Sequence, residues 1–560
     1  MSDPTTDNSA PEVFRPAREV VRSGPTRVWL LLAWITLLAA ICFWLKSGDF
    51  DPGVGNSAIN ASVILSILGY SIWTLSSSGW GFPVKWGMAL LPFGLMAAFY
   101  TQLLPVEVLM DGDVGIVGWR WRWNQPDKQL EVPVCAGAET LDWQTTTHDY
   151  PRFLGNGYWA EVPGVTLETD WQASPPQEMW RKKIGAGWSA FAIVGDYAVT
   201  QEQRREQEFV TCYEVRSGDI VWTHADRVRW DPRGTGSMGY VGPRATPTVH
   251  EGRVYSLGAT GILNCLEATC GRMVWSHDTL AKHGATNVNW GKACSPLIVD
   301  KTVVVSVGGE QDQSLVAYDI ESGDVAWAAG TYQSSYASPV LAQIAGETQV
   351  LSVDQGFVTA HDATDGEFLW EYEWPSNSGG DAATSQPVPL AGDRVFFSKG
   401  YGHGSALVQI TRDDSDGWLA RPLWKKSRQY GQLPVMKTKM GNVVIRDGYV
   451  YGLDDVNLQC IELETGKKRW KKRRTPKFGH GQIMLIGDAI LVLTELGELV
   501  LVEPSPEKYK ELTSFRAFPD DQITWNNPAF APPYLLVRNA EEAVCYELPL
   551  KEVLAVAQKK

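Results

Sequence analysis

A turn followed by Gly-x-x-x-Trp recurs along the chain and constrains its fold more than any other feature of the sequence. Successive tryptophans of this motif lie roughly 40–55 residues apart, a period typical of propellers and solenoids. The full copies are Ser217-Gly218…Trp222, Cys270-Gly271…Trp275, Ser322-Gly323…Trp327, Asp365-Gly366…Trp370 and Thr465-Gly466…Trp470. A longer variant runs from Asp416-Gly417 to Trp424, Trp180 lies about one period before the first copy, and Phe515 about one period after the last.

Each repeat also carries the marks of four short β-strands. An alternating strand precedes the glycine turn, as in Val316–Ile320, and a hairpin signal lies upstream of it, as in Glu251–Tyr255. A further strand follows a polar–proline pair, which is Thr246-Pro247, Ser295-Pro296, Ser338-Pro339, Gln386-Pro387 or Asn527-Pro528. Short strands at this period predict an all-β propeller. The apolar positions from Trp180 to Phe515 predict eight blades over residues 177–548.

The two ends of the repeat region predict a closed ring. After Phe515 the chain still has strand-like segments at 529–539 and 543–548, but no Gly-x-x-x-Trp follows them. Trp180, in contrast, precedes any complete blade. We therefore expect the strand around Trp180 to supply the outer strand of the last blade, because this pairing satisfies edge hydrogen bonds that an open ring leaves unpaired.

At these residues the chain resembles the family of PQQ-type β-propeller repeats, over roughly residues 177–548. The resemblance implies that one tryptophan per repeat packs between adjacent blades, namely Trp180, Trp222, Trp275, Trp327, Trp370, Trp424 and Trp470. The segment Asp149–Gly155 also resembles the stretch that precedes such propellers in membrane-anchored members. The family contains quinoprotein dehydrogenases, which hold pyrroloquinoline quinone (PQQ) and Ca²⁺ in the central funnel, and cofactor-free scaffolds such as a lipoprotein of outer-membrane assembly.

Departures from the dehydrogenase pattern favour the scaffold. Large quinoprotein alcohol dehydrogenases carry two adjacent cysteines, whereas the 8 cysteines of this chain include no such pair and no CxxCH. We expect these cysteines to be buried free thiols, and the sequence identifies no catalytic residue. The prediction is a binding and assembly scaffold of the cell envelope. The alternative is a PQQ-dependent dehydrogenase that oxidises an alcohol or sugar and passes electrons to membrane quinone.

The inner strands of a propeller begin at the mouth of its funnel, so the residues before the polar–proline pairs are candidates for a binding site. They are Trp188, Arg244, Lys292, Tyr336, Thr384, Lys439, His480 and Asn526. PQQ with Ca²⁺ is the possible cofactor, because converging cations suit its carboxylates. Its candidate ligands are Arg244, Lys292, Tyr336, Lys439, His480 and Asn526. The alternative is that these side chains reach solvent or pair with neighbouring acids. The histidines show no metal-site spacing.

Three apolar runs ahead of the repeats predict a transmembrane anchor: Val28–Leu45, Ala58–Leu75 and Trp86–Leu104. A helix of this length spans about 27 Å, close to the thickness of a bilayer core. Arg15, Arg18, Arg22 and Arg27 precede the first run and predict a cytoplasmic tail, residues 1–27. Three spans (28–104) place the connector 105–176, the propeller and the tail 549–560 on the periplasmic side of the inner membrane. The alternative is a two-span hairpin with the remainder cytoplasmic.

Two further patterns are candidates for interaction surfaces. The alternating segment Trp119–Trp123 predicts either an interfacial aromatic anchor or a half-buried strand. The basic stretch Lys467–Lys477 predicts a face for an envelope protein or another anionic ligand, such as lipid headgroups, or else a solvated strand. Further cations expected on that face are Lys425, Lys426, Arg428 and Lys437. The net charge of −14 argues against nucleic acid as a partner.

Overall fold

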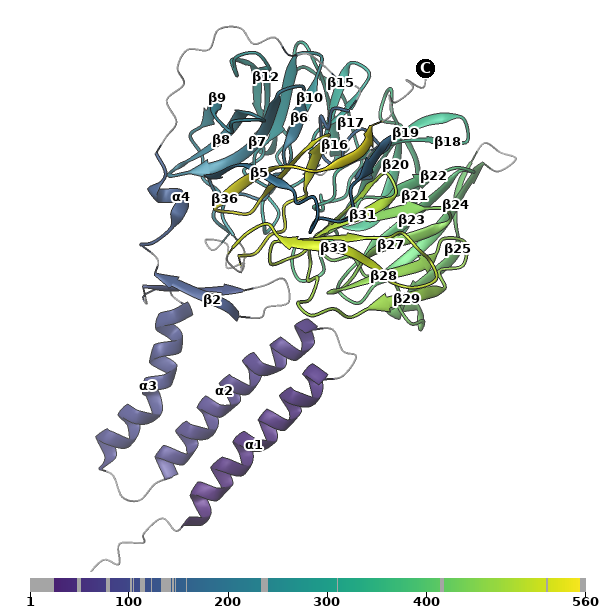
Figure 1. The fold of residues 1–560 in the computed structure, drawn as a ribbon. Coiled ribbons are helices and arrows are strands. Elements are labelled where there is room, and N and C mark those ends of the chain that lie inside the picture. Colours follow the sequence, from purple (N-terminus) through teal and green to yellow (C-terminus); the bar gives the residue numbers. More distant parts are fainter. Residues whose placement is uncertain are drawn as a thin grey trace, which may run out of the picture. The chain divides into compact units, whose positions relative to one another are not determined.

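In the computed structural model the chain forms two compact units, Met1–Trp123 and Asn124–Lys560. The first consists of helices and a hairpin, and the second is almost entirely β-sheet (Figure 1). The structure describes residues 25–47, 52–76, 81–100, 103, 105–110, 116–121, 123–131, 143, 146, 148–157, 159–232, 240–309, 311–412, 417–519 and 522–553. The predicted cytoplasmic arginines Arg15, Arg18 and Arg22 lie outside the described residues.

The first unit has one helix over each predicted apolar run. They are α1 (Pro25–Ser47), α2 (Pro52–Ser76) and α3 (Phe82–Tyr100). Small polar side chains join them: Cys42 Sγ lies 3.1 Å from Ser62 Oγ, and Ser71 Oγ donates to the Ala89 carbonyl at 2.8 Å. The helices therefore pack in chain order, with the kind of small-residue contact that lets apolar helices approach closely.

Within the described residues, one helical segment is long and apolar enough to cross a membrane, Gly55–Ser76. The other two apolar segments, Leu32–Trp44 and Phe82–Ala98, are shorter. The prediction of three transmembrane helices is therefore confirmed only in part. The helix that is long and apolar enough is α2, which contains the most serines of the three. Those serines do not interrupt it, because Ser62 and Ser66 donate to the carbonyls one turn earlier, each at 2.7 Å.

The hairpin of β1 (Val106–Met110) and β2 (Ile116–Trp121) ends in exposed indoles. Trp119, Trp121 and Trp123 have exposed fractions of 63%, 41% and 66%. The rings of Trp121 and Trp123 stack with centroids 4.8 Å apart, and Arg120 pairs with Glu107 at 2.8 Å. The tryptophans thus form an exposed face rather than the half-buried strand that was the alternative expectation.

The described part of the second unit contains eight antiparallel blades, which confirms the predicted propeller. The first four blades are β6 (Ala192–Val194), β7 (Tyr197–Arg204), β8 (Gln207–Glu214), β9 (Ile220–Asp226); β10 (Thr248–His250), β11 (Arg253–Leu257), β12 (Ile262–Glu267), β13 (Met273–Asp278); β14 (Leu297–Val299), β15 (Thr302–Gly309), β16 (Gln313–Asp319), β17 (Val325–Ala329); and β18 (Val340–Ile344), β19 (Glu347–Val353), β20 (Gly356–Asp362), β21 (Phe368–Trp374). The others are β22 (Val388–Leu390), β23 (Arg394–Lys399), β24 (Gly404–Arg412), β25 (Trp418–Ser427); β26 (Val443–Arg446), β27 (Tyr449–Asp454), β28 (Asn457–Glu462), β29 (Lys468–Lys472); β30 (Gln482–Ile486), β31 (Ala489–Leu493), β32 (Glu498–Val502), β33 (Glu511–Arg516); and β34 (Ala529–Ala531), β35 (Tyr534–Arg538), β36 (Glu542–Glu547), β5 (Gln177–Lys183).

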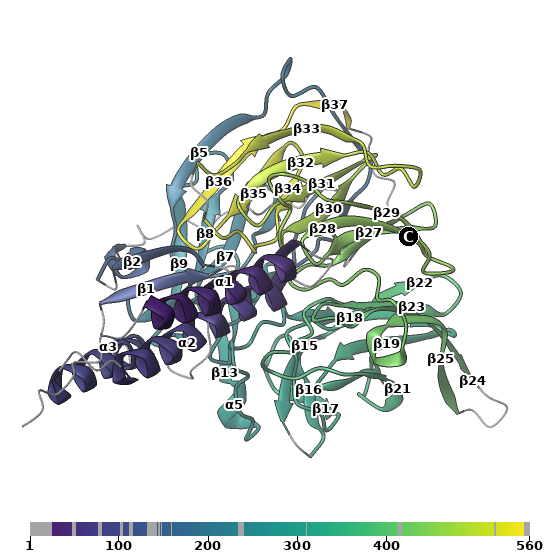
Figure 2. The ribbon, with the colours of Figure 1, turned by 90° about the horizontal axis from the view of Figure 1, so that it is seen from below.

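The last blade is completed by the strand from the start of the propeller. Strand β5 pairs with β36, with Trp180 opposite Cys545, so the ring closes as predicted (Figure 2). The neighbouring seventh blade gains a fifth strand, β3 (Glu161–Val162), which lies parallel to β30. A short pair also joins β4 (Val165–Leu167) to β37 (Leu550–Val553). Segments on both sides of 177–548 therefore add strands to the propeller, which the repeat pattern did not predict.

The repeat tryptophans lie where adjacent blades meet. Trp180 and Trp222 donate through Nε1 to the Val215 and Ala268 carbonyls of the next blade at 2.7 and 2.8 Å. Trp275, Trp424 and Trp470 donate in the same way to Ile320, Leu463 and Ser505. Trp327 packs on Gly366, Trp370 donates to Gln349 of its own blade, and Phe515 packs edge-on against Tyr546. The motif glycine is required because a Cβ on Gly271 would lie 2.4 Å from the Trp222 ring.

Candidate functional site: the central funnel and an outer groove

The first strand of each blade lies innermost; β10, for example, contacts the first strands β6 and β14 of its neighbours. Hydrogen bonds that involve a side chain join neighbouring blades near the starts of these strands. Their donor–acceptor pairs are Ala190 N–Thr246 Oγ1, Thr246 N–Ser295 Oγ, Ser295 N–Ser338 Oγ, Gln386 Nε2–Ser338 O, Gln386 N–Asn442 Oδ1, Gln482 Nε2–Met440 O, Gln482 Nε2–Trp525 O and Asn526 Nδ2–Ser189 O. All eight junctions are bridged: Thr246, Ser295, Ser338 and Gln386 of the polar–proline pairs serve five of them, and Gln482 and Asn526 serve the other three.

Arg244 directs its guanidinium to the protein itself. Its Nη1 and Nη2 donate to the carbonyls of Gly242 and Tyr240 at 2.7 and 2.8 Å. Burial lowers the pKa of Arg244 to about 10, although Tyr336 and Glu208 lie near enough to oppose the shift. Glu208 is buried, accepts from Ala259 N at 3.1 Å, and has a pKa raised to about 8 by burial and by Asp226.

Lys292 is 1% exposed and its ammonium is held by two acceptors of the neighbouring strands. It donates to the Val307 carbonyl at 2.5 Å and to Ser334 Oγ at 2.7 Å. Burial lowers its pKa to about 8, and burial likewise raises the pKa of nearby Asp354 to about 6. This lysine therefore ties the second and third blades to the fourth rather than presenting a charge to a ligand.

The remaining funnel candidates also make contacts within the protein. Tyr336 donates to the Ser378 carbonyl at 2.5 Å, and burial raises its pKa. The Lys439 ammonium lies 5.0 Å from the Tyr401 ring centre, and the Lys439 carbonyl accepts from Thr384. His480 is buried, with its backbone N–H bound to Glu495; Asn526 is fully buried, and Trp188 packs on Trp525.

These residues do not fit a PQQ–Ca²⁺ pair as they stand. The cations expected to hold its carboxylates, Arg244 and Lys292, have their donors on carbonyl and hydroxyl oxygens. In the part of the chain that the structure describes, no three His, Cys, Asp or Glu side chains come together in a metal-binding group. Among the proposed ligands, Arg244 and Tyr336 lie close to each other. Asn526 instead donates to the Ser189 carbonyl, across the junction between the eighth and first blades.

The sequence reasoning missed the acids that face these cations. Lys399 is 1% exposed and pairs with Asp381 at 2.5 Å, and His403 Nε2 contacts the same carboxylate at 2.9 Å. Asp354 directly follows β19, the second strand of the fourth blade, and Glu495 lies two residues after β31, the second strand of the seventh. An acid just after the second strand, compared across blades, is the signal that would have identified Asp354 and Glu495.

Three of the eight cations in the predicted basic stretch form ion pairs inside the sixth and seventh blades, whereas Lys467, Lys468, Lys472, Arg473 and Lys477 are exposed. Arg474 contacts Glu498 at 2.6 Å and Glu511 at 3.0 Å. Lys471 pairs with Asp454 at 2.7 Å, and Arg469 pairs with Glu462 at 3.0 Å. Lys437 pairs with Asp455. These cations serve the propeller itself, which leaves fewer of them to form the expected basic face.

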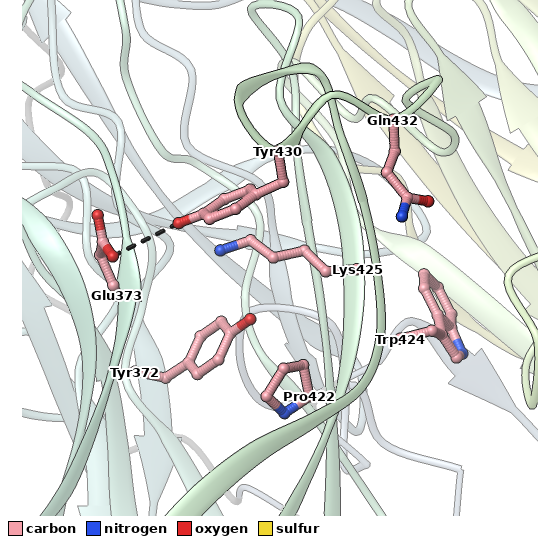
Figure 3. Close-up of a pocket in the computed structure, with 7 residues that line it drawn as sticks. All are labelled: Tyr372, Glu373, Pro422, Trp424, Lys425, Tyr430 and Gln432. Atoms are coloured by element: carbon pink, nitrogen blue, oxygen red, sulfur yellow. Dashed lines mark hydrogen bonds between the residues drawn. The ribbon is translucent and has the colours of Figure 1, made fainter.

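A groove of about 440 Å³ lies between the outer strands β21 and β25 of the fourth and fifth blades (Figure 3). It is lined by Tyr372, Glu373, Pro422, Trp424, Lys425, Tyr430 and Gln432. The Lys425 ammonium lies 3.7 Å from the Tyr430 ring centre and 5.0 Å from that of Tyr372. Burial lowers the pKa of Lys425 to about 8, against the effect of Glu373.

The fold is an eight-bladed propeller in which a repeat tryptophan packs on a glycine of the next blade at five junctions, which is the pattern of propellers with PQQ-like repeats. Residues 206–472 match the family described as outer membrane protein assembly factor BamB. The match covers slightly less than half of the chain, and the curated proteins that the chain resembles include both a quinohemoprotein alcohol dehydrogenase and a BamB protein.

Two curated relatives and one solved structure show the range of the similarity. The quinohemoprotein alcohol dehydrogenase ADH-IIG of Pseudomonas putida is 30% identical over 145 residues, which are 23% of this chain and 19% of that protein. BamB of Moranella endobia is 21% identical over 260 residues, 46% of this chain and 63% of that protein. The match thus spans less than two thirds of either relative. Quinohemoprotein alcohol dehydrogenase from Comamonas testosteroni has a TM-score of 0.51 and 12% identity, covers 73% of this chain and 81% of that one, and shows a shared fold.

Proposed function

We propose that this chain is a membrane-anchored propeller that acts as a binding and assembly scaffold in the cell envelope. The observation that carries the proposal is the use of the funnel cations within the protein. Lys292 and Arg244 bind oxygens of the neighbouring strands and loops, where a quinoprotein needs cations for its cofactor. The remaining surface for a partner is then the outside of the blades and their loops. The match of 206–472 to the BamB family supports the same reading.

The proposed anchor has three spans, with the N-terminus in the cytoplasm and the propeller in the periplasm. Helix α2 has the length and apolarity of a span, and α1 and α3 pack against it. The exposed indoles of Trp119, Trp121 and Trp123 follow α3, and tryptophan is enriched at membrane–water interfaces. Arg27 and the three arginines before it supply the charge bias for this orientation.

The alternative function is a PQQ-dependent dehydrogenase acting on an alcohol or sugar. Two observations favour it: the 30% identity to a quinohemoprotein alcohol dehydrogenase and the fold shared with another. When bound, PQQ would supply the two-electron oxidation. Arg244 and Lys439 are the cations that would have to turn toward its carboxylates, giving up their present contacts.

A titration of PQQ, with and without Ca²⁺, into the detergent-solubilised chain separates the two functions. A ligand at 100 times its Kd stabilises a protein by about 2.7 kcal/mol, which is readily seen as a thermal shift. The scaffold predicts no saturable shift and no dye-linked electron transfer. A saturable shift that is lost in Arg244→Ala, together with turnover of an alcohol or sugar, would establish the dehydrogenase instead.

Alkaline phosphatase fusions test the membrane topology. A fusion after Lys46 reports the first loop, one after Gly81 the second, and one after Leu130 the connector. Three spans predict activity for the first and third fusions and none for the second. An inactive third fusion would favour the two-span hairpin with a cytoplasmic propeller.

A further inference from the structure

The groove between β21 and β25 contains an ammonium group that no acceptor neutralises. The Lys425 ammonium makes no hydrogen bond or ion pair with any residue that the structure describes. Its neighbours are instead the rings of Tyr430, Tyr372 and Trp374, at 3.7, 5.0 and 5.6 Å from the ammonium nitrogen. A cation held over aromatic faces has lost part of its hydration, so it gains strongly from a bound anion.

The next blade shows what this position looks like when an anion is present. Lys425 directly follows Trp424, and Lys471 directly follows Trp470, at the same place in the fifth and sixth blades. Lys471 pairs with the buried carboxylate of Asp454 at 2.7 Å. The fifth blade has no equivalent acid against Lys425, since Glu373 lies at the rim, where it accepts from Tyr430 at 3.4 Å. The carboxylate of this pair is therefore missing from the groove.

The surroundings of Lys425 indicate what kind of molecule would bring that carboxylate. Leu423 and Leu433, on β25 and just beyond it, are exposed to 52% and 87%. Arg421 on the same strand is exposed as well. Strand β25 is the outer strand of its blade, so its free edge is available to another segment. Exposed leucines beside unpaired cations are complementary to a chain with both apolar and acidic side chains.

We propose that the groove of Tyr372, Lys425 and Tyr430 binds an acidic, leucine-rich peptide segment of an envelope protein, with one carboxylate on the Lys425 ammonium. This proposal rests on the scaffold function and gives it a partner chemistry. The rings of Tyr372 and Tyr430 flank the bound carboxylate, and the apolar side chains of the peptide cover Leu423 and Leu433 (Figure 3). Glu373 repels a second acid at the rim and so favours a single carboxylate at this point.

Fluorescence anisotropy with a labelled peptide of alternating leucine and glutamate tests the site on the full chain in detergent. The matched probe has glutamine in place of glutamate. Lys425→Met removes the charge and keeps most of the stem. We expect saturable binding of the acidic probe, weakened about tenfold or more in Lys425→Met, since one charge-assisted contact is of the order of 1.4 kcal/mol. The glutamine probe is expected to bind the wild type as weakly as the variant binds the acidic probe.

The control variant is Lys472→Met, which removes a second lysine that lies over an aromatic ring, 5.3 Å from the centre of Tyr509 on the next blade. It is expected to bind the acidic probe like the wild type, and thermal melting of each variant shows that the propeller is folded. Equal binding of the two probes, or no effect of Lys425→Met, would overturn the proposal. Cross-linking to one defined envelope protein that is unchanged in Lys425→Met would preserve the scaffold function and reject only the groove.

Discussion

The indole Nε1 of Trp180 donates a hydrogen bond of 2.7 Å to the backbone carbonyl of Val215. Trp180 lies on β5, the last strand of the eighth blade, while Val215 follows β8 of the first blade. The same ring packs over Gly218, where a Cβ would lie 2.5 Å from it. This contact fastens the seam at which the ring closes.

Removing that indole should weaken the whole propeller. Trp180→Ala is expected to lower the free energy of unfolding by about 3–5 kcal/mol, the usual cost of deleting a buried aromatic ring. Chemical denaturation followed by circular dichroism gives this value. Trp119→Ala serves as the control, because that indole is 63% exposed, and it should change stability by less than about 0.5 kcal/mol. Equal effects of the two variants would show that the seam does not depend on Trp180.

Alanine substitutions at two glycines with similar backbone conformations distinguish the cost of backbone strain from the cost of a steric clash. Gly271 and Gly252 have φ values of +70° and +74°, so alanine is strained at both. At Gly271 the new Cβ would also meet Trp222 at 2.4 Å, whereas at Gly252 nothing lies within 4 Å. Gly252→Ala is expected to cost about 1 kcal/mol and Gly271→Ala at least about 2 kcal/mol more. Melting temperatures that match would contradict the docking role of Gly271.

Arg538 is fully buried at the same seam and donates to three acceptors of the first blade and its approach. These are Thr200 Oγ1 at 2.9 Å, the Gln201 carbonyl at 2.9 Å and the Gly185 carbonyl at 2.8 Å. Arg538→Met leaves these acceptors unsatisfied and is expected to destabilise by about 3–5 kcal/mol. Arg446→Met, which removes a surface pair with Asp488, should cost less than about 1 kcal/mol in the same unfolding experiment.

The raised pKa of Glu208 makes stability depend on pH in a definite direction. Burial and Asp226 raise this pKa to about 8 in the folded chain, above that of an unfolded glutamate. Between pH 4.5 and 8 the folded state therefore binds more protons, and the free energy of unfolding falls as the pH rises. Glu208→Gln should remove this slope and gain stability relative to wild type at pH 8. Parallel denaturant midpoints at pH 5 and 8 for both proteins would disprove the assignment.

The propeller architecture could be predicted because the same packing contact between neighbouring blades recurs along the sequence. A glycine under a tryptophan, as at Gly271 and Trp222, recurs at five of the eight junctions among the described residues, and an aromatic side chain recurs at all eight, so the spacing of these aromatic residues counts the blades. The absence of such a glycine after Phe515 even predicted which strand closes the ring. The added strands β3 and β37 have no repeated pattern, which is why they were missed.

The contacts of the funnel residues were harder to predict, because the sequence does not reveal which residue a charged side chain pairs with in the folded protein. Lys292 was expected to face a ligand, yet it binds Ser334 and Val307. The residues that satisfy it are 15 and 42 positions away, Val307 on β15 of the third blade and Ser334 in the link from the third blade to the fourth. The basic stretch shows the same difficulty, because Lys471 finds Asp454 across its own sheet. Lys425, which has no such acid, is distinguished from it only in three dimensions.

The pairing of β5 with β36 also governs how the protein can be made. Arg181 and Tyr546, in contact across this pair, are separated by 365 residues. A ribosome that adds about 5–20 residues per second needs roughly 20–70 s to reach from one to the other. During that time β5 has no β36 to pair with, and the ring stays open. Nascent chains are then most exposed to proteases and chaperones in this interval, and a chain that is cut short before β36 yields a ring that stays open.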